Sequence, residues 1–342
     1  MVSDLRHKIA LSLLLALVVF AGLAIYGDVR ALPTALARFR WGYLPLILGL
    51  TLINYALRFV KWEYYLRRLN VRGVPLGTSL AIFLSGFAFL LTPGKVGEVV
   101  KSYFLRGLAG VPMARTAPII MAERLTDGVA MALLCTVGLT VGPAGQTWVL
   151  LGVTLGGLLA LIVLAQWRSG ALRLLGWGER LPLLGRFAHS LHQFYESAAD
   201  LLRPRALLVA IAIGVVSWGM EGVAFYFVLR GLGVPPGVHL LQQAIFILAF
   251  ATIIGAIVMM PGGLGGAEAS IAGLLQLMVR TPETVAVAAT LLIRFGTLWF
   301  GVGLGVAALS LNRRRLFESS AIGDQIADLQ ASSGHRPLTM DS

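Results

Sequence analysis

Long stretches without charge constrain the fold of this chain more than any other feature of its sequence. Eight uncharged or nearly uncharged blocks cover residues 9–26, 41–57, 74–94, 117–142, 147–166, 206–229, 238–260 and 285–311. Each is about 20 residues long, the length that a helix needs to cross the hydrocarbon core of a bilayer. Only 13% of the residues are charged, against about 25% in a soluble domain. The sequence therefore predicts an all-α polytopic membrane protein with about eight membrane segments.

The distribution of the 28 lysines and arginines predicts how these segments are oriented, because cytoplasmic loops carry an excess of both residues. We expect 74–94 and 238–260 to be re-entrant. In that arrangement 21 of the cations, nine of them between Arg58 and Arg115, lie on the side of the amino terminus and five on the other. The prediction is a multi-pass protein of the cytoplasmic (inner) membrane with both termini cytoplasmic. The net charge of +12 is assigned to loops that face anionic lipid, with no role for nucleic acid.

The chain contains an internal repeat. Residues 64–77 (YYLRRLNVRGVPLG) resemble residues 225–238 (FYFVLRGLGVPPGV), and each copy is followed by a Pro-Gly turn and an embedded arginine. One crossing separates the copies, so the second is inverted relative to the first, as in transporters that bind substrate near the bilayer midplane. We expect a single transmembrane domain over 1–315, made of repeat one (about 41–142), a connecting span (147–166), an amphipathic cytoplasmic segment (167–205) and repeat two (about 206–311). A polar, disordered tail (316–342) is expected to follow.

Each repeat contains a helix that proline and glycine interrupt. The first break contains Pro93, Gly94, Lys95, Gly97 and Lys101, and the second contains Pro261, Gly262, Gly263 and Gly265. Proline blocks the helix that precedes it and glycine permits the turn. The helix that restarts begins with free N–H groups and a positive dipole end, which suit an anionic group such as a phosphate. We treat these residues as candidates for substrate binding, and purely structural kinks are the alternative.

Ionisable residues inside the apolar blocks are the second group of candidates. They are Glu98, Glu123, Arg124, Asp127, Glu221, Glu268 and Arg294. A charge at the bilayer centre costs about 2.5–3.5 kcal/mol, so each must face protein or water. In the functional interpretation Arg124 and Arg294 bind a headgroup phosphate bidentately, and the carboxylates hold the arginines or carry protons. In the structural alternative Glu98 and Glu268 stabilise their own half-helices, Arg124 pairs with Glu98, and Arg294 pairs with Glu221 or Glu268.

The sequence lacks the usual signatures of catalysis. The one cysteine, Cys135, lies in an apolar block, and the five histidines do not have the spacing of a zinc ligand pair. There is no phosphate-binding Gly-x-x-x-x-Gly-Lys-Ser/Thr loop and no Gly-x-Ser-x-Gly elbow. We expect no metal, no cofactor and no catalytic residue, and therefore a transporter. A membrane-embedded transferase that uses Glu98 or Glu123 as a base is the enzymatic alternative.

Three blocks of the sequence resemble a known family. TPGKVGEVVKSYFL (92–105), ERLTDGVAMALL (123–134) and PGGLGGAEASIAGLL (261–275) are similar to the signature blocks of the lysylphosphatidylglycerol synthase transmembrane-region family, also called flippase-like domain proteins. The resemblance extends over about 40–312. It implies movement of a lipid between leaflets, and it carries over to the proline, glycine and charged positions of these blocks. Because the chain ends soon after Arg315, we expect a stand-alone member without the soluble aminoacyl-transfer domain.

Together these observations predict a lipid flippase that moves an anionic or glycosylated lipid between leaflets of the cytoplasmic membrane by alternating access. The expected partner is a membrane lipid of the phospholipid, polyprenyl-phosphate or hopanoid type, and a lipid-synthesis enzyme or a second copy of the chain are further candidates. The alternative is a non-transporting accessory subunit that holds a lipid- or glycolipid-synthesis enzyme at the membrane through residues 168–205.

Overall fold

The computed structural model describes residues 30–92, 97–137, 188–258 and 260–317, together with the isolated positions 19, 21, 22, 25, 152 and 156. Every regular element in these ranges is helical. Four helices are long and apolar enough to cross a bilayer: Trp41–Arg68, Pro204–Gly231, Val238–Ile257 and Glu283–Leu311. The all-α membrane fold is therefore confirmed. The predicted segments 9–26 and 147–166 lie almost entirely outside the described residues.

The described helices fall into two sets of the same order. The first set is α3 (Leu44–Arg68), α4 (Leu76–Ser85) with its 3₁₀ turn η2 (Gly86–Phe89), α5 (Val100–Ala109) and α6 (Met113–Cys135). The second set is α10 (Pro204–Gly231), α11 (Val238–Ile257), α12 (Gly266–Leu274), and α13 (Glu283–Arg294) continued by α14 (Phe300–Leu311). Shorter elements are α2 (Leu32–Ala37), η1 (Trp41–Tyr43), η6 (Pro261–Gly263) and α9 (Ala188–Leu201).

Proline and glycine set several of these boundaries. Pro204 occupies the first turn of α10, where its missing N–H has no partner to lose and its fixed φ fits the helix. Gly110 ends α5 with a left-handed φ of 64° that favours glycine. The π-helical turns η7 (Leu275–Val279) and η8 (Phe295–Trp299) interrupt the second set. The sequence pattern had not predicted these π turns, which in helices often mark functional positions.

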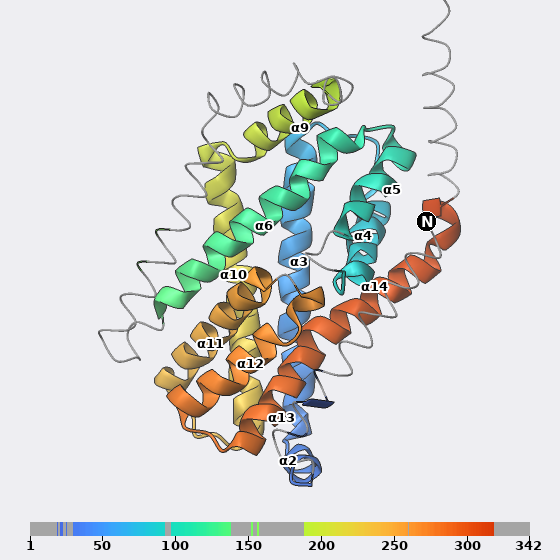
Figure 1. The fold of residues 1–342 in the computed structure, drawn as a ribbon. Helices are drawn as coiled ribbons and strands as arrows, with labels where there is room; N and C mark the ends of the chain where they lie inside the picture. Colours follow the sequence, from blue (N-terminus) through green and yellow to red (C-terminus); the bar gives the residue numbers. More distant parts are fainter. Residues whose placement is uncertain are drawn as a thin grey trace, which may run out of the picture.

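The two sets run in opposite directions through the molecule (Figure 1). Helix α3 runs from the end where α2 lies to the end where α9 lies, and α10 runs back alongside it. The hairpin of α4 and α5 enters from the α9 end, whereas the hairpin of α11 and α12 enters from the α2 end. Both hairpins turn at mid-height of the bundle. This is the predicted inverted repeat, in which each set contains a helix pair that turns back within the bundle. Helix α11 is at the same time long and apolar enough to cross a bilayer.

Each re-entrant hairpin packs on the last helix of the other set. Helix α14 packs against α4 and η2, and α11 packs against α6. Gly305 permits the first of these contacts, since a Cβ there would lie 2.2 Å from the backbone nitrogen of Ala88. Gly301 and Gly305 form the Gly-x-x-x-Gly spacing that lets membrane helices approach closely. The two repeats are therefore interlocked.

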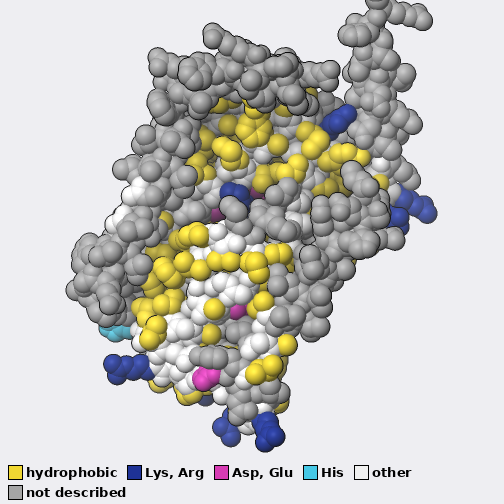
Figure 2. Space-filling model, viewed as in Figure 1, with side chains coloured by type: hydrophobic (Ala, Val, Ile, Leu, Met, Phe, Trp, Pro, Cys, Tyr) yellow, Lys and Arg dark blue, Asp and Glu magenta, His cyan; other side chains and the backbone are white. Residues whose placement is uncertain are grey.

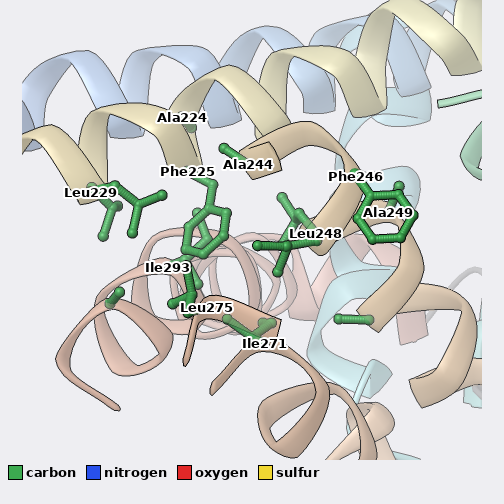
Figure 3. Close-up of a cluster of buried hydrophobic side chains, with 14 of the residues drawn as sticks. Ala224, Phe225, Leu229, Ala244, Phe246, Leu248, Ala249, Ile271, Leu275 and Ile293 are labelled. Atoms are coloured by element: carbon green, nitrogen blue, oxygen red, sulfur yellow. The ribbon is translucent and has the colours of Figure 1, made fainter. Parts of the chain in front are cut away.

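Two apolar clusters form the core. Figure 3 shows part of the first, in which Phe225 and Leu229 of α10 lie beside Leu248 of α11, Leu275 and Ile293. The second cluster lies around Trp62, Phe83 and Phe104 and joins α3, α4, α5 and α14. Leu90, Leu91, Leu264 and Leu298 also belong to it. The residues that flank the two breaks thus share one apolar cluster.

The structure corrects the predicted end of the first described span. The apolar block 41–57 stops at Leu57, yet α3 continues for three more turns to Arg68. Arg58 is 6% exposed and Lys61 is fully buried, so their assignment to a cytoplasmic loop is wrong. Lys101, counted in the same loop, is 2% exposed. These three cations belong to the interior, where carboxylates from other helices lie.

The described helices extend into two further segments, the expected disordered tail (316–342) and the expected amphipathic segment (167–205). Leu316 and Phe317, the first residues of the expected tail, are helical, and Leu316 is buried. The ring of Phe317 meets Phe104 of α5 at 5.4 Å between centroids. Helix α9, part of the expected amphipathic segment 167–205, lies across one end of the bundle (Figure 1). Residues 167–187 and 318–342 lie outside the described residues.

Candidate functional site

The first break places Gly97 and Glu98 at the tip of the α4–α5 hairpin. Pro93, Gly94 and Lys95 lie outside the described residues. The Gly97 N–H donates to the hydroxyl of Thr92 at 2.9 Å. A Cβ on Gly97 would lie 2.7 Å from the Cβ of Phe89 and from the methyl of Thr92. Glycine at this position is therefore required by the closeness of the turn.

Four charged side chains gather behind the first break. The carboxylate of Glu98 accepts from Arg124 Nη2 at 3.2 Å and lies 3.4 Å from Lys101 Nζ. Lys101 Nζ is also 2.9 Å from Glu123 Oε2 and lies over the ring of Trp62 at 4.9 Å. Glu98, Lys101 and Glu123 are nearly inaccessible, whereas the Arg124 side chain is 28% exposed. Two cations and two carboxylates therefore balance, and the Arg124 side chain is the most exposed member of the group.

The second break is built from glycines in the left-handed region. The φ angles of Gly262, Gly263 and Gly265 are 64°, 70° and 84°, which other residues adopt only at a cost. Arg294 Nη2 donates to the carbonyl of Gly262 at 2.7 Å, and Arg294 Nε donates to Glu268 Oε1 at 2.6 Å. The other oxygen of Glu268 accepts from the Gly265 N–H at 2.7 Å. One arginine thus fixes the turn, and one carboxylate joins that arginine to the start of α12.

The two breaks repeat the same pair with the same spacing. Glu98 and Arg124 are 26 residues apart, as are Glu268 and Arg294. The breaks also meet, since a Cβ on Gly262 would lie 3.0 Å from a methyl carbon of Leu91. The structure therefore forms the Arg124–Glu98 pair, and for Arg294 it selects Glu268 from the two expected partners. Glu268 additionally caps its own half-helix, as the structural alternative predicted.

A third polar group joins α3, α6 and α10 and was missed from the sequence. Lys61 Nζ forms a buried ion pair with Asp127 Oδ1, and the Asn54 amide donates to the Ser217 carbonyl at 2.8 Å. The missed signal is a helical stripe along α3, namely Thr51, Asn54, Tyr55, Arg58, Lys61, Trp62 and Tyr65, all buried. Polar residues at this spacing inside an apolar helix indicate a face turned toward protein.

Tyr55 connects this third group to the second break. Its hydroxyl donates to the carbonyl of Thr297 in the π-helical turn η8, three residues after Arg294. Glu221 is 5% exposed and lies within electrostatic reach of Tyr55, as does Arg58. The sequence candidates Asp127 and Glu221 thus belong to a group between α3, α6 and α10.

In the described part of the chain, three buried cations and two partly exposed arginines lie among five buried carboxylates. The buried cations are Arg58, Lys61 and Lys101, the arginines are Arg124 and Arg294, and the carboxylates are Glu98, Glu123, Asp127, Glu221 and Glu268. Figure 2 shows basic and acidic side chains near the middle of one face, between bands of hydrophobic side chains. Within the described ranges, no group of three histidine, cysteine, aspartate or glutamate residues could hold a metal ion. The arrangement is suited to binding and exchanging charged groups through arginine and carboxylate.

Comparison with known sequences assigns the family. The sequence profile of the lysylphosphatidylglycerol synthase TM region matches residues 9–305 of this chain. Two UPF0104 membrane proteins of Methanothermobacter thermautotrophicus are each 25% identical to it, over 89% and 94% of this chain and over 96% and 97% of their own lengths. A UPF0104 membrane protein of Pyrococcus horikoshii is 24% identical over 76% of this chain and 84% of its own. The protein is a member of the lysylphosphatidylglycerol synthase transmembrane-region family.

Proposed function

We propose that this protein moves an anionic or glycosylated lipid between the two leaflets of the membrane by alternating access. The observation that carries the proposal is the Glu–Arg pair that occurs at both helix breaks. The hairpins that contain these breaks enter the bundle from opposite ends, and the breaks meet in its middle. Inverted repeats with a broken helix in each copy are typical of transporters whose substrate binds near the midplane.

The arginines supply the chemistry for an anionic headgroup. A guanidinium carries five N–H donors and binds phosphate bidentately. Within the described part of the chain, Arg124 donates to Glu98 alone and its Nε has no hydrogen-bond partner. The Arg294 side chain is 13% exposed, whereas Glu268 is fully buried. A phosphate that approaches either break would meet the arginine first and would compete with the glutamate behind it.

The packing supports exchange of access between the two sides. Each hairpin rests on the last helix of the other repeat, so a rotation of one repeat against the other would change the packing at both breaks. The pairs at the breaks are equivalent in both halves, so a headgroup could be bound with similar contacts when either side is open. Acyl chains would stay in the lipid while the headgroup passes along the interior charges.

The test is reconstitution of the full chain into liposomes that contain fluorescent lipids, with dithionite added outside to bleach the exposed leaflet. The panel should include phosphatidylglycerol, phosphatidylcholine and a polyprenyl phosphate. We expect protein-dependent movement of at least one of these lipids, and a loss of about ten-fold or more in the variants Arg124→Ala and Arg294→Ala.

Arg67→Ala is the matched control, because Arg67 is exposed in the last turn of α3. Absence of movement for every lipid contradicts the proposal, as does full activity in both arginine variants. If no lipid moves and a lipid-synthesis enzyme co-purifies with the chain, the accessory-subunit alternative takes its place.

A further inference from the structure

Arg58 is a buried cation whose hydrogen-bonding groups are unused. It lies on α3 and is 6% exposed. Its guanidinium lies over the rings of Phe87 and Trp218, at 5.5 and 5.6 Å from their centroids. It makes no hydrogen bond and no ion pair with any residue in the described ranges. The five N–H donors of this guanidinium are therefore free to bind a ligand, while its charge acts on Asp127 through space.

A second unsatisfied donor lies beside it. The indole Nε1 of Trp218 is buried and has no hydrogen-bond partner among the described residues. Indole and guanidinium can only donate, so a ligand here must offer several acceptor oxygens. The rings of Phe87 and Trp218 shield the guanidinium, and shielding from water strengthens its attraction for an anion.

Arg58 and Trp218 lie at corresponding places in the two repeats, to within one residue of the register that pairs 64–77 with 225–238. Arg58 precedes Pro75 by 17 residues, and Trp218 precedes Pro235 by 17 residues, in the Val-Pro-x-Gly segments that follow the two long helices. Positions that the repeat relates to each other therefore come into contact between α3 and α10. A residue at this place is available to a ligand that arrives from either half.

Contacts on both sides place Arg58 between the two breaks. Phe87, which covers its guanidinium, lies in the turn η2 that leads into the first break. Tyr55, less than one turn earlier on α3, bonds to the Thr297 carbonyl close to Arg294 at the second break. Lys61, less than one turn later, pairs with Asp127, which follows Arg124 by three residues.

We propose that Arg58 and the indole of Trp218 bind the phosphate of an anionic lipid headgroup midway between Arg124 and Arg294. This assignment rests on the proposed function and names the chemical class of its substrate. Asp127 and Glu221 face the same region from α6 and α10. A doubly charged monoester is repelled more strongly by these carboxylates than a singly charged phosphodiester is, so the site favours the phosphodiester.

The experiment measures thermal unfolding of the purified full chain in a neutral detergent, with increasing phosphatidylglycerol, phosphatidic acid or inorganic phosphate. We expect phosphatidylglycerol to raise the melting temperature of the wild type and of the control Arg67→Met. In Arg58→Met the half-saturating phosphatidylglycerol concentration should rise about ten-fold, and Arg58→Lys, which keeps the charge but loses the bidentate geometry, should fall in between.

Lipid-free stability separates binding from a structural role. A guanidinium without hydrogen bonds is a cost to the ligand-free fold, so Arg58→Met should melt at the wild-type temperature or above it. A lower melting temperature that Arg58→Lys restores, with unchanged dependence on phosphatidylglycerol in both variants, overturns the proposal. Stabilisation by phosphatidic acid at lower concentration overturns the diester preference. Stabilisation by inorganic phosphate and by neither lipid assigns the site to the free ion and overturns the lipid assignment.

The binding and transport experiments together distinguish failure of the Arg58 assignment from failure of the proposed lipid transport. If phosphatidylglycerol binds in an Arg58-dependent way but no lipid moves in proteoliposomes, the assignment of Arg58 stands and the proposed function fails. If lipid moves equally well in wild type and Arg58→Met, the proposed function stands and the assignment of Arg58 fails.

Discussion

The ion pair at the second break should dominate the local stability of the fold. Glu268 is fully buried, and its two oxygens accept from Arg294 at 2.6 Å and from the Gly265 N–H at 2.7 Å. Glu268→Gln removes the countercharge and leaves the Arg294 guanidinium mostly enclosed. Breaking one partner of a buried pair costs about 3–5 kcal/mol. We expect a value near the lower end, because Arg294 keeps its bond to the Gly262 carbonyl.

The assay is a double-mutant cycle on unfolding free energy in mixed micelles titrated with sodium dodecyl sulphate. Arg294→Met alone strands the buried carboxylate and should cost about as much as Glu268→Gln. The double variant should cost far less than the sum of the two, so that the coupling energy is about 2–3 kcal/mol. Glu283→Gln, at an exposed glutamate in the first turn of α13, is the control. Effects that add to within about 0.5 kcal/mol would refute the reasoning.

Two further predictions concern the interlocked packing of the repeats. Gly305→Ala should destabilise the protein by about 1–3 kcal/mol or more, because the new Cβ meets the backbone of η2. Gly303→Ala, on the same helix, is the control and should be neutral, because a Cβ there has nothing within 4 Å. Equal melting temperatures of the two variants would contradict the contact at Gly305. Tyr55→Phe should cost about 1–2 kcal/mol, because it leaves the Thr297 carbonyl of the π-helical turn without its hydroxyl donor. Unchanged hydrogen exchange around η8 in that variant would show that the bond does not hold the turn.

The repeat and its breaks could be predicted because they depend on local chemistry. Proline and glycine interrupt a helix wherever they occur, so the breaks near Gly97 and Gly262 are visible in the sequence. The Arg124–Glu98 pair could be expected as one alternative, because a charge inside the membrane must lie beside an opposite charge. The partner of Arg294 could not be chosen between Glu221 and Glu268, because that choice depends on how α12 and α13 pack.

The third polar group escaped prediction for a physical reason. The uncharged block 41–57 stops just before Arg58 and Lys61. A prediction of spans from uncharged blocks therefore places these two residues in a loop. Helix α3 nevertheless continues, because their charges face Asp127 and aromatic rings rather than lipid. The periodic stripe of polar residues along α3 carried this information, whereas hydropathy averaged over a window does not. The π turn after Arg294 has no comparable sequence signal.

The account depends most directly on whether lipid crosses the bilayer through this protein. The decisive measurement is the fraction of fluorescent phosphatidylglycerol that dithionite bleaches over time in proteoliposomes of the wild type and of the double variant Arg124→Ala/Arg294→Ala. We predict that bleaching with the wild type proceeds beyond the outer-leaflet half toward completion, and that the double variant slows this second phase by at least about ten-fold. A wild-type trace that stops at the outer-leaflet half, as in protein-free vesicles, would contradict the account.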